Sequence, residues 1–187
     1  MQPANSYEDL MAMVEMHDDV QEKIRAAFDS ENYIECCWFC YACFESRVNR
    51  TMEKLCPGCA KPDRTTERRV GITTKLHCLN KLNQSGYELF EGADLTVVTN
   101  VISWCKERNK LIHGLVSLNQ YEKSNYRFRN LAKRGVPLVE RFYASVTKIR
   151  TNYYNADALP PLDESVVGNC RLKSKCMKGA FNEAAHM

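Results

Sequence analysis

The chain has 187 residues and a mass of 21.5 kDa; 44% of its residues are hydrophobic, 26% are charged, and its net charge is +3 at pH 7. This composition predicts a globular domain with an ordinary hydrophobic core and a short appendage. The opening residues lack the basic start and continuous apolar run of a signal peptide. The longest apolar run, "CCWFCYACF", is far shorter than the roughly 20 residues that cross a bilayer. We therefore expect a soluble cytoplasmic protein with no membrane segment.

Charge is distributed unevenly along the chain. From Glu8 to Glu35 nine acidic residues stand against two basic ones, whereas from Tyr121 to Arg150 eight basic residues stand against two acidic ones. A basic segment of this kind can attract phosphate groups, although solvated helix faces are often charged in the same way.

Apolar residues recur at intervals of three and four, which is the spacing of one face of an α-helix. The first predicted helix follows Ser6, a suitable cap, and carries apolar residues as far as Phe28. The second begins after Ser30, and its predicted inward stripe consists of Ile34, Cys37, Trp38, Tyr41, Val48, Met52 and Leu55. A neighbouring stripe consists of Cys36, Cys40 and Cys43. The loop "CPGCAKPDRTT" follows.

The later segments are helical as well. A third helix is predicted over about 67–83, and a fourth starts near Asp94 and contains "CKERNKLIHG". A basic helical region covers about 121–154 and is expected to break at "RGVP", where Pro137 suits the first turn of a new helix. No strand alternation is present, so we predict an all-α fold, an antiparallel bundle of about five helices in residues 1–158, followed by a linker and a loosely ordered basic tail in 159–187.

The fourth helix contains polar residues within an apolar pattern. Its stripe consists of Leu95, Val98, Ile102, Cys105, Asn109, Ile112 and Val116. Asn109 therefore takes an apolar slot, with Arg108 at the margin and His113 about 40° from Asn109 on the same face. A buried polar group costs about 1–3 kcal/mol without a partner, so Asn109 indicates a partner or a role. Basic residues before a glycine also end many helices, which explains Gly114 but not Asn109.

The same residues carry a resemblance. "RNKLIHG", in which Arg108 and His113 are separated by four residues, resembles the arginine-x4–6-histidine motif of the HEPN superfamily. "DSENYIECCWFCYACFESRVNRTMEKL" is similar to the second helix of that family, and the likeness extends over roughly residues 6–154. HEPN proteins are small helical bundles, and many are endoribonucleases that need no metal. The resemblance thus implies a helical ribonuclease.

The roles that the resemblance implies are specific. A homodimer would bring two copies of the motif into one cleft, where Arg108 binds the scissile phosphate, His113 transfers a proton and Asn109 orients either of them. Attack by the RNA's own 2′-hydroxyl requires no cofactor. The residues expected to guide the RNA backbone are Lys110, Arg127, Arg129, Lys133 and Arg134, and those expected to stack on bases are Tyr121, Tyr126 and Phe128.

The resemblance also bears on partners. It implies a toxin–antitoxin or antiviral defence system, with a nucleotidyltransferase-like protein as the antitoxin in the first case. The alternative is a catalytically inactive HEPN-like module that dimerises or binds a partner and is stabilised by zinc.

Ten cysteines without an export signal predict thiols rather than a disulfide framework. Cys56 and Cys59 in "CPGC" have the spacing of half a zinc knuckle, so a structural zinc ion is one interpretation, and small core thiols are the other. Glu45, within the stripe of the second helix, is either a buried partner of Arg47 or Arg108 or a marginal residue in water.

Overall fold

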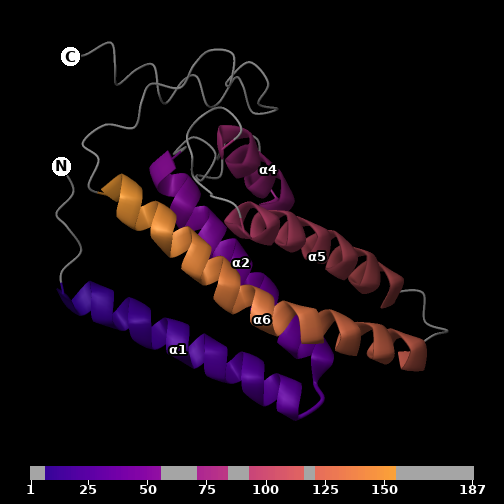
Figure 1. Ribbon diagram of the computed structural model, residues 1–187. Helices are drawn as coiled ribbons and strands as arrows, with labels where there is room; N and C mark the ends of the chain where they lie inside the picture. Colours follow the sequence, from indigo (N-terminus) through magenta and orange to yellow (C-terminus); the bar gives the residue numbers. More distant parts are fainter. Residues whose placement is uncertain (1–6, 56–70, 84–92, 116–120, 155–187) are drawn as a thin grey trace, which may run out of the picture. The chain divides into compact units, whose positions relative to one another are not determined.

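The computed structural model describes residues 7–55, 71–83, 93–115 and 121–154 (Figure 1). These residues form helices and no strand: α1 Tyr7–Asp29, α2 Tyr33–Leu55, α4 Ile72–Leu82, α5 Ala93–Leu115 and α6 Tyr121–Tyr154. The predicted all-α helical bundle is confirmed for this part of the chain. Within the same residues, none of the helices is both long and apolar enough to cross a membrane. The predicted boundary between 158 and 159 lies outside the described residues, as do Cys56 and Cys59.

The helices pack into two compact units, and α2, α5 and α6 each contribute to both. Unit 1 comprises residues 1–43 and 107–137, and unit 2 comprises residues 44–106 and 138–187, in each case as far as they are described. Unit 1 thus contains α1 and the C-terminal end of α5, whereas unit 2 contains α4 and the N-terminal part of α5. All the predicted catalytic and RNA-binding residues belong to unit 1.

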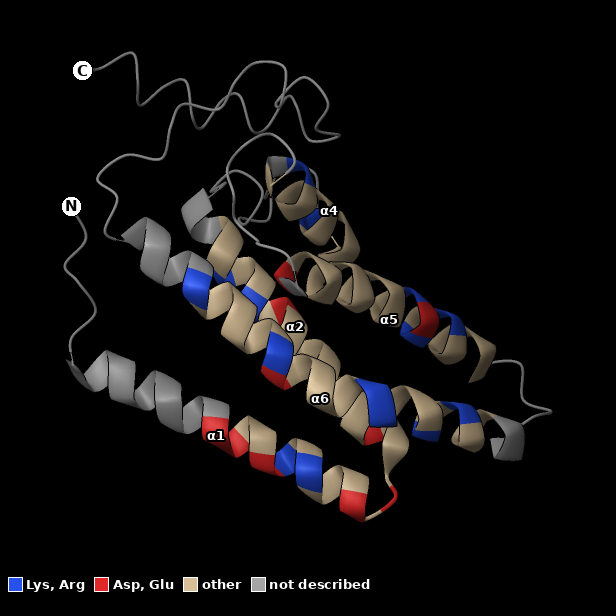
Figure 2. Ribbon diagram, viewed as in Figure 1, with Lys and Arg blue, Asp and Glu red and all other residues tan. Residues whose placement is uncertain are grey.

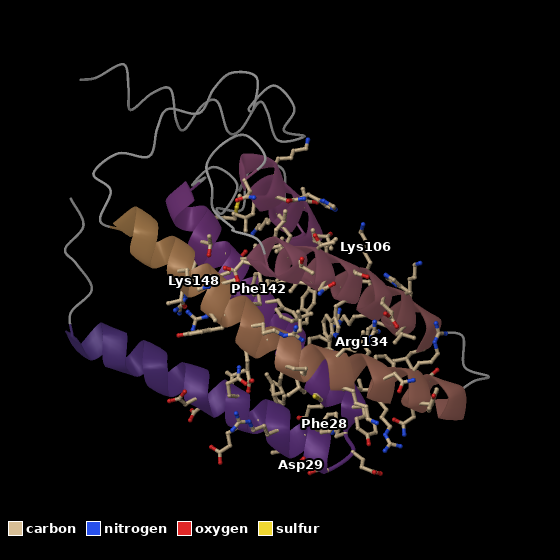
Figure 3. The ribbon with its side chains drawn as sticks, viewed as in Figure 1. Phe28, Asp29, Lys106, Arg134, Phe142 and Lys148 are labelled. Carbon is tan, nitrogen blue, oxygen red and sulfur yellow. The ribbon has the colours of Figure 1, made fainter. Side chains whose placement is uncertain are left out.

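The core of unit 2 is centred on Phe44 of α2, which is fully buried. Its ring lies edge-to-face against Trp104 of α5, with 5.3 Å between the ring centroids, and against Phe142 of α6, at 5.6 Å (Figure 3). Aromatic pairs in this geometry add about 0.5–1.5 kcal/mol beyond the burial of their area. Phe44 therefore joins three helices of unit 2.

Polar contacts reinforce this packing where α5 begins. Asp94, in the first turn of α5, accepts a hydrogen bond of 2.7 Å from Ser145 and forms an ion pair of 3.2 Å with Lys148, both on α6. A carboxylate is favourable here because the first turn of a helix has unpaired N–H groups and a partial positive charge.

The core of unit 1 combines small and large side chains. Its buried members are Ile24, Ala27, Tyr33, Cys36, Cys37, Cys40, Leu111, Phe128, Leu131 and Ala132. The Cys37 thiol donates a hydrogen bond of 3.8 Å to the backbone carbonyl of Phe128, which ties α2 to α6. Because thiols are small, they allow neighbouring helices to approach closely. Helical cysteines as core residues, one of the two interpretations of the sequence, fit this packing.

The turn between α1 and α2 is fixed by local hydrogen bonds. The N–H of Glu31 bonds to Phe28 O at 3.1 Å, and the N–H of Asn32 bonds to Ala27 O at 2.9 Å, as in a Schellman motif. Glu31 has a positive φ of 58°. Asn32 then caps α2: its side chain accepts from the N–H of Glu35 and donates to the Glu35 carboxylate, at 3.4 and 2.6 Å.

Two sequence-based expectations about the helices are wrong. Trp38 was predicted to face inward but is 55% exposed. Cys37, Val48 and Met52 of the predicted stripe are buried, and the buried face of α2 also includes Cys40 and Phe44, on the side of the helix away from Trp38. The expected break at "RGVP" does not occur, and Pro137 lies inside a continuous α6. A proline in a helix interior costs about 3 kcal/mol, but buried residues continue at helical spacing on both sides of it, and their packing offsets that cost.

We predict that Glu31→Gly raises the free energy of unfolding by about 0.5–1 kcal/mol, because a non-glycine residue in the left-handed region is strained by roughly 1–2 kcal/mol. The measurement is equilibrium urea unfolding followed by circular dichroism. Glu22→Gly, at an exposed position within α1, is the matched control and should lower stability by about 1 kcal/mol. Equal losses in the two variants would contradict the role assigned to Glu31.

Candidate functional site

Arg108 occupies the centre of the buried stripe of α5. Val101, Cys105 and Leu111 precede and follow it at intervals of three and four, and all are buried; Arg108 itself is 9% exposed. Asn109 is only half-buried. The prediction that Asn109 takes the apolar slot and Arg108 the margin is therefore wrong by one residue. The buried face of α5 differs from the predicted one because the helices that pack against α5 decide which of its residues are buried.

The Arg108 guanidinium lies over two aromatic rings of α2. Its Cζ is 4.4 Å from the ring centroid of Tyr41 and 5.0 Å from that of Trp38. Because these residues are three apart, they lie about 60° apart around α2 and can face one cation together. A cation over an aromatic face gains about 0.5–1 kcal/mol when exposed and about 2 kcal/mol when desolvated. The two rings thus compensate part of the cost of burying the charge.

Hydrogen bonding satisfies Arg108 only in part. Its Nη1 donates to Asn109 Oδ1 at 3.2 Å, whereas its Nε is buried and has no hydrogen-bond partner among the described residues. A buried N–H without an acceptor costs about 1–3 kcal/mol. Asn109 therefore holds Arg108, whose Nε is a buried donor left unpaired among the described residues.

His113 lies in a different setting. It is exposed near the end of α5, about 140° around the helix from Arg108, and no hydrogen bond joins it to Arg108 or Asn109 among the described residues. Gly114 is also exposed, and a Cβ built on it would meet nothing within 4 Å, so the described part of the chain makes no close approach there. Arg108 and Asn109 are thus bonded to each other, whereas His113 makes no hydrogen bond to either in the described part of the chain.

The predicted RNA-binding residues are all exposed, and Figure 2 shows basic residues along α6 and acidic ones on α1. Arg127 and Arg134, seven residues apart, lie within about 20° of each other around α6, whereas Arg129 and Lys133 lie on the opposite side of its buried stripe. Lys110 is exposed on α5. The predicted basic residues therefore form at least two groups rather than one patch.

One of these groups borders the end of α5. Arg134 Nη2 lies 2.5 Å from the carboxylate of Glu107, the residue before Arg108 (Figure 3). Both side chains of this pair are partly exposed, so it contributes less than about 1 kcal/mol to stability. Its effect is to hold one α6 arginine close to the site of Arg108.

The residues expected to stack on bases differ in exposure. Phe128 is fully buried, so that prediction is wrong: the residue belongs to the core of unit 1. Tyr126 is 66% exposed, and the side chain of Tyr121 lies outside the described part of the chain. Trp38 was missed as a surface residue because the periodicity of α2 placed it inside. Its spacing of three from Tyr41 was the available signal.

Glu45 is exposed, which confirms the interpretation of a marginal glutamate in water. Its candidate partner Arg47 lies over the ring of Tyr143, with Cζ 3.9 Å from the centroid. In the described part of the chain, no group of three or more His, Cys, Asp or Glu side chains is arranged to hold a metal ion. The zinc hypothesis for Cys56 and Cys59 stays a prediction.

The thiols of α2 respond to burial and to nearby charges. Burial, and secondarily the charge of Cys36, raise the pKa of Cys37 from 9.0 to about 12, while Arg108 and Arg134 lower it in part. The hydrogen bond with Cys36, followed by burial, raises the pKa of Cys40. Cys37 thus stays protonated at neutral pH.

The comparisons with known proteins identify no relative: no family model matches the chain, and no curated protein or solved structure gives a significant match. The candidate site is therefore defined by the geometry of Arg108, Asn109, Trp38 and Tyr41 and by the sequence motif that includes His113.

We predict a coupling of about 1–2 kcal/mol between Arg108 and Tyr41 in a double-mutant cycle of Arg108→Met and Tyr41→Leu, because each substitution keeps the apolar bulk and removes one half of the cation–ring contact. The measurement is the free energy of unfolding of the four proteins. The control cycle replaces Lys110, exposed about 160° from Arg108, by Met and should give no coupling. Additive effects in both cycles would show that the contact between Arg108 and the Tyr41 ring contributes nothing to the free energy of unfolding.

We also predict that the protein loses about 2 kcal/mol of stability between pH 8 and pH 10.5 in excess of the loss in Cys37→Ser. The thiol ionises more readily in the unfolded chain, so its contribution is complete below pH 9 and is lost as pH rises toward 12. Serine keeps a donor for Phe128 O but does not ionise in this range. Parallel curves of unfolding free energy against pH for the two proteins would refute the assignment.

Proposed function

We propose that this protein is an endoribonuclease of the HEPN type that cleaves RNA without a metal, within a toxin–antitoxin or antiviral defence system. The observation that carries the proposal is Arg108, a guanidinium placed at the centre of a buried stripe and oriented by Asn109 and two rings, with one N–H that lacks an acceptor among the described residues. A phosphate oxygen is an acceptor that suits this donor. The resemblance of "RNKLIHG" to the HEPN motif supplies the reaction type.

The residues take distinct roles in this proposal. Arg108 binds the scissile phosphate and stabilises the charge that develops on it, which a forked and permanently charged donor set does well. His113 takes the proton of the attacking 2′-hydroxyl or gives one to the leaving 5′-oxygen. The 2′-oxygen forms a bond to phosphorus while the bond to the 5′-oxygen breaks, so the products are a 2′,3′-cyclic phosphate and a free 5′-hydroxyl. DNA, which lacks the nucleophile, is not a substrate.

A second copy of the chain completes the site in this proposal. Arg108 and His113 point to different sides of α5, so one chain offers them separately. In a two-fold dimer, the imidazole of one chain can meet a phosphate held by the other.

A non-catalytic interaction module is the second candidate. The observation that favours it is the deep burial of Arg108, which is 9% exposed, together with the exposure of the neighbouring Trp38. Exposed tryptophan is enriched at protein interfaces, where it anchors a partner. In that case the motif residues stabilise a surface and carry no chemistry.

The test is cleavage of a labelled single-stranded RNA in the presence of EDTA. We expect the parent protein to cut RNA, Arg108→Lys to lose about 10²–10³-fold in rate because the fork is lost, and His113→Gln to lose about 10²–10⁴-fold because proton transfer is lost. The ends of the products should be a cyclic phosphate and a hydroxyl.

Lys23→Ala on α1 is the matched control, since it removes an exposed positive charge from the acidic helix and should leave the rate unchanged. Circular dichroism of each variant establishes that it is folded. Cleavage at the parental rate by both Arg108→Lys and His113→Gln would overturn the catalytic assignment. A pure, folded dimer that cuts no RNA at all would favour the interaction module.

A further inference from the structure

Trp38 combines two properties that are rarely found together. It is 55% exposed, and the buried guanidinium of Arg108 lies over its ring, 5.0 Å from the centroid. An exposed indole usually moves freely, whereas a ring held by a buried cation has a fixed orientation. Trp38 thus presents an exposed aromatic surface whose orientation is fixed by Arg108.

The charges around Trp38 favour a polyanion. Its neighbour in sequence, Cys37, is influenced by Arg108 and Arg134 as well as by Glu107, so these groups all lie near this part of α2. Arg127 lies on the same side of α6 as Arg134 and is exposed. A ligand that carries both a flat ring and a phosphate therefore matches the site. Arg134 is held by Glu107 and Arg127 is exposed, so this side of α6 presents positive charge to a phosphate chain.

We infer that Trp38 is a stacking platform for one unpaired nucleobase of a single-stranded nucleic acid. The guanidinium of Arg108 occupies one face of the indole, so the base stacks on the opposite face. Bases within a duplex have both faces covered, and the site therefore selects single strands, loops or bulges. This inference rests on the proposed function for the identity of the ligand as RNA, but stacking itself requires no cleavage.

Tryptophan fluorescence can report binding at Trp38. The chain has two tryptophans, Trp38 and Trp104, and Trp104 is 2% exposed. Intrinsic fluorescence is recorded while the protein is titrated with a short single-stranded oligonucleotide of mixed sequence, 2′-O-methylated throughout so that it lacks the nucleophile. We expect the emission of Trp38 to be quenched on binding and that of Trp104 to stay constant. The same oligonucleotide annealed to its complement, and inorganic polyphosphate, should give no quenching.

Variants separate stacking from structure. Trp38→Ala should weaken binding by about 5- to 150-fold, the range for loss of one stacked base, whereas Trp38→Phe should restore most of the affinity because a phenyl ring also stacks. Affinity is measured by the anisotropy of a labelled oligonucleotide, and folding by circular dichroism. Tyr126→Ala tests the other large exposed aromatic residue of unit 1, which is also expected to stack, and should weaken binding less than Trp38→Ala does. Ser46→Ala, at an exposed position of α2, is the control and should change affinity by less than about twofold.

The outcomes distinguish this inference from the proposed function. Quenching of Trp38 together with weaker binding by Trp38→Ala, without any RNA cleavage, would support the stacking platform and contradict the proposed ribonuclease activity. RNA cleavage together with unchanged Trp38 emission and full affinity of Trp38→Ala would support the ribonuclease activity and contradict the stacking platform. A loss of affinity confined to Tyr126→Ala, or a Trp38→Ala effect on the sedimentation of the free protein alone, would overturn the inference and assign Trp38 to a protein interface. No binding of any oligonucleotide would overturn it as well.

Discussion

The arrangement of unit 1 depends on how it accommodates one buried cation. Arg108 occupies the position on α5 where an aliphatic residue would complete the stripe, and removing a guanidinium from water is costly unless other groups replace the water. The two rings of α2 and one amide oxygen replace part of it. Because Trp38 and Tyr41 lie against the cation, they are not in the centre of the core. That place on α2 belongs to the buried Cys37 and Cys40, and Cys37 bonds to the carbonyl of Phe128 on α6.

These partners do not satisfy every hydrogen-bond donor of Arg108 within the described part of the chain. Among the described residues, the buried Nε of Arg108 has no acceptor, so the guanidinium is not fully paired within this part of the chain. Phosphate contacts fix the position of a nucleic acid, and base contacts distinguish one strand from another. Arg108 and Trp38 would divide these two tasks between them, one through charge and the other through an aromatic face.

Charge acts over longer distances than these contacts. The acidic residues of α1 and the basic residues of α6 as far as Arg134 belong to unit 1, so a phosphate chain would experience repulsion and attraction within this unit (Figure 2). Such an uneven field restricts the directions from which a polyanion can approach. Next to Arg108, the ion pair between Glu107 and Arg134 weakens this field. The Glu107 carboxylate holds Arg134 in place and leaves the other basic residues of unit 1 charged.

The sequence by itself determined that the chain is helical, where α1, α2 and α5 begin to within a few residues, and which segment contains the polar residues of interest. Those properties follow from spacing and from local sequence signals at the ends of helices, which act within one or two turns. Periodicity did not determine which side of each helix is buried, because α2 and α5 have apolar residues on more than one side. Only the tertiary structure decided that Arg108 rather than Asn109 is inside, that Trp38 is outside, and that α6 continues through Pro137. The reason is the same in each case: burial is set by the helices that pack against a residue, and packing energies of several kcal/mol exceed the preferences of any single position.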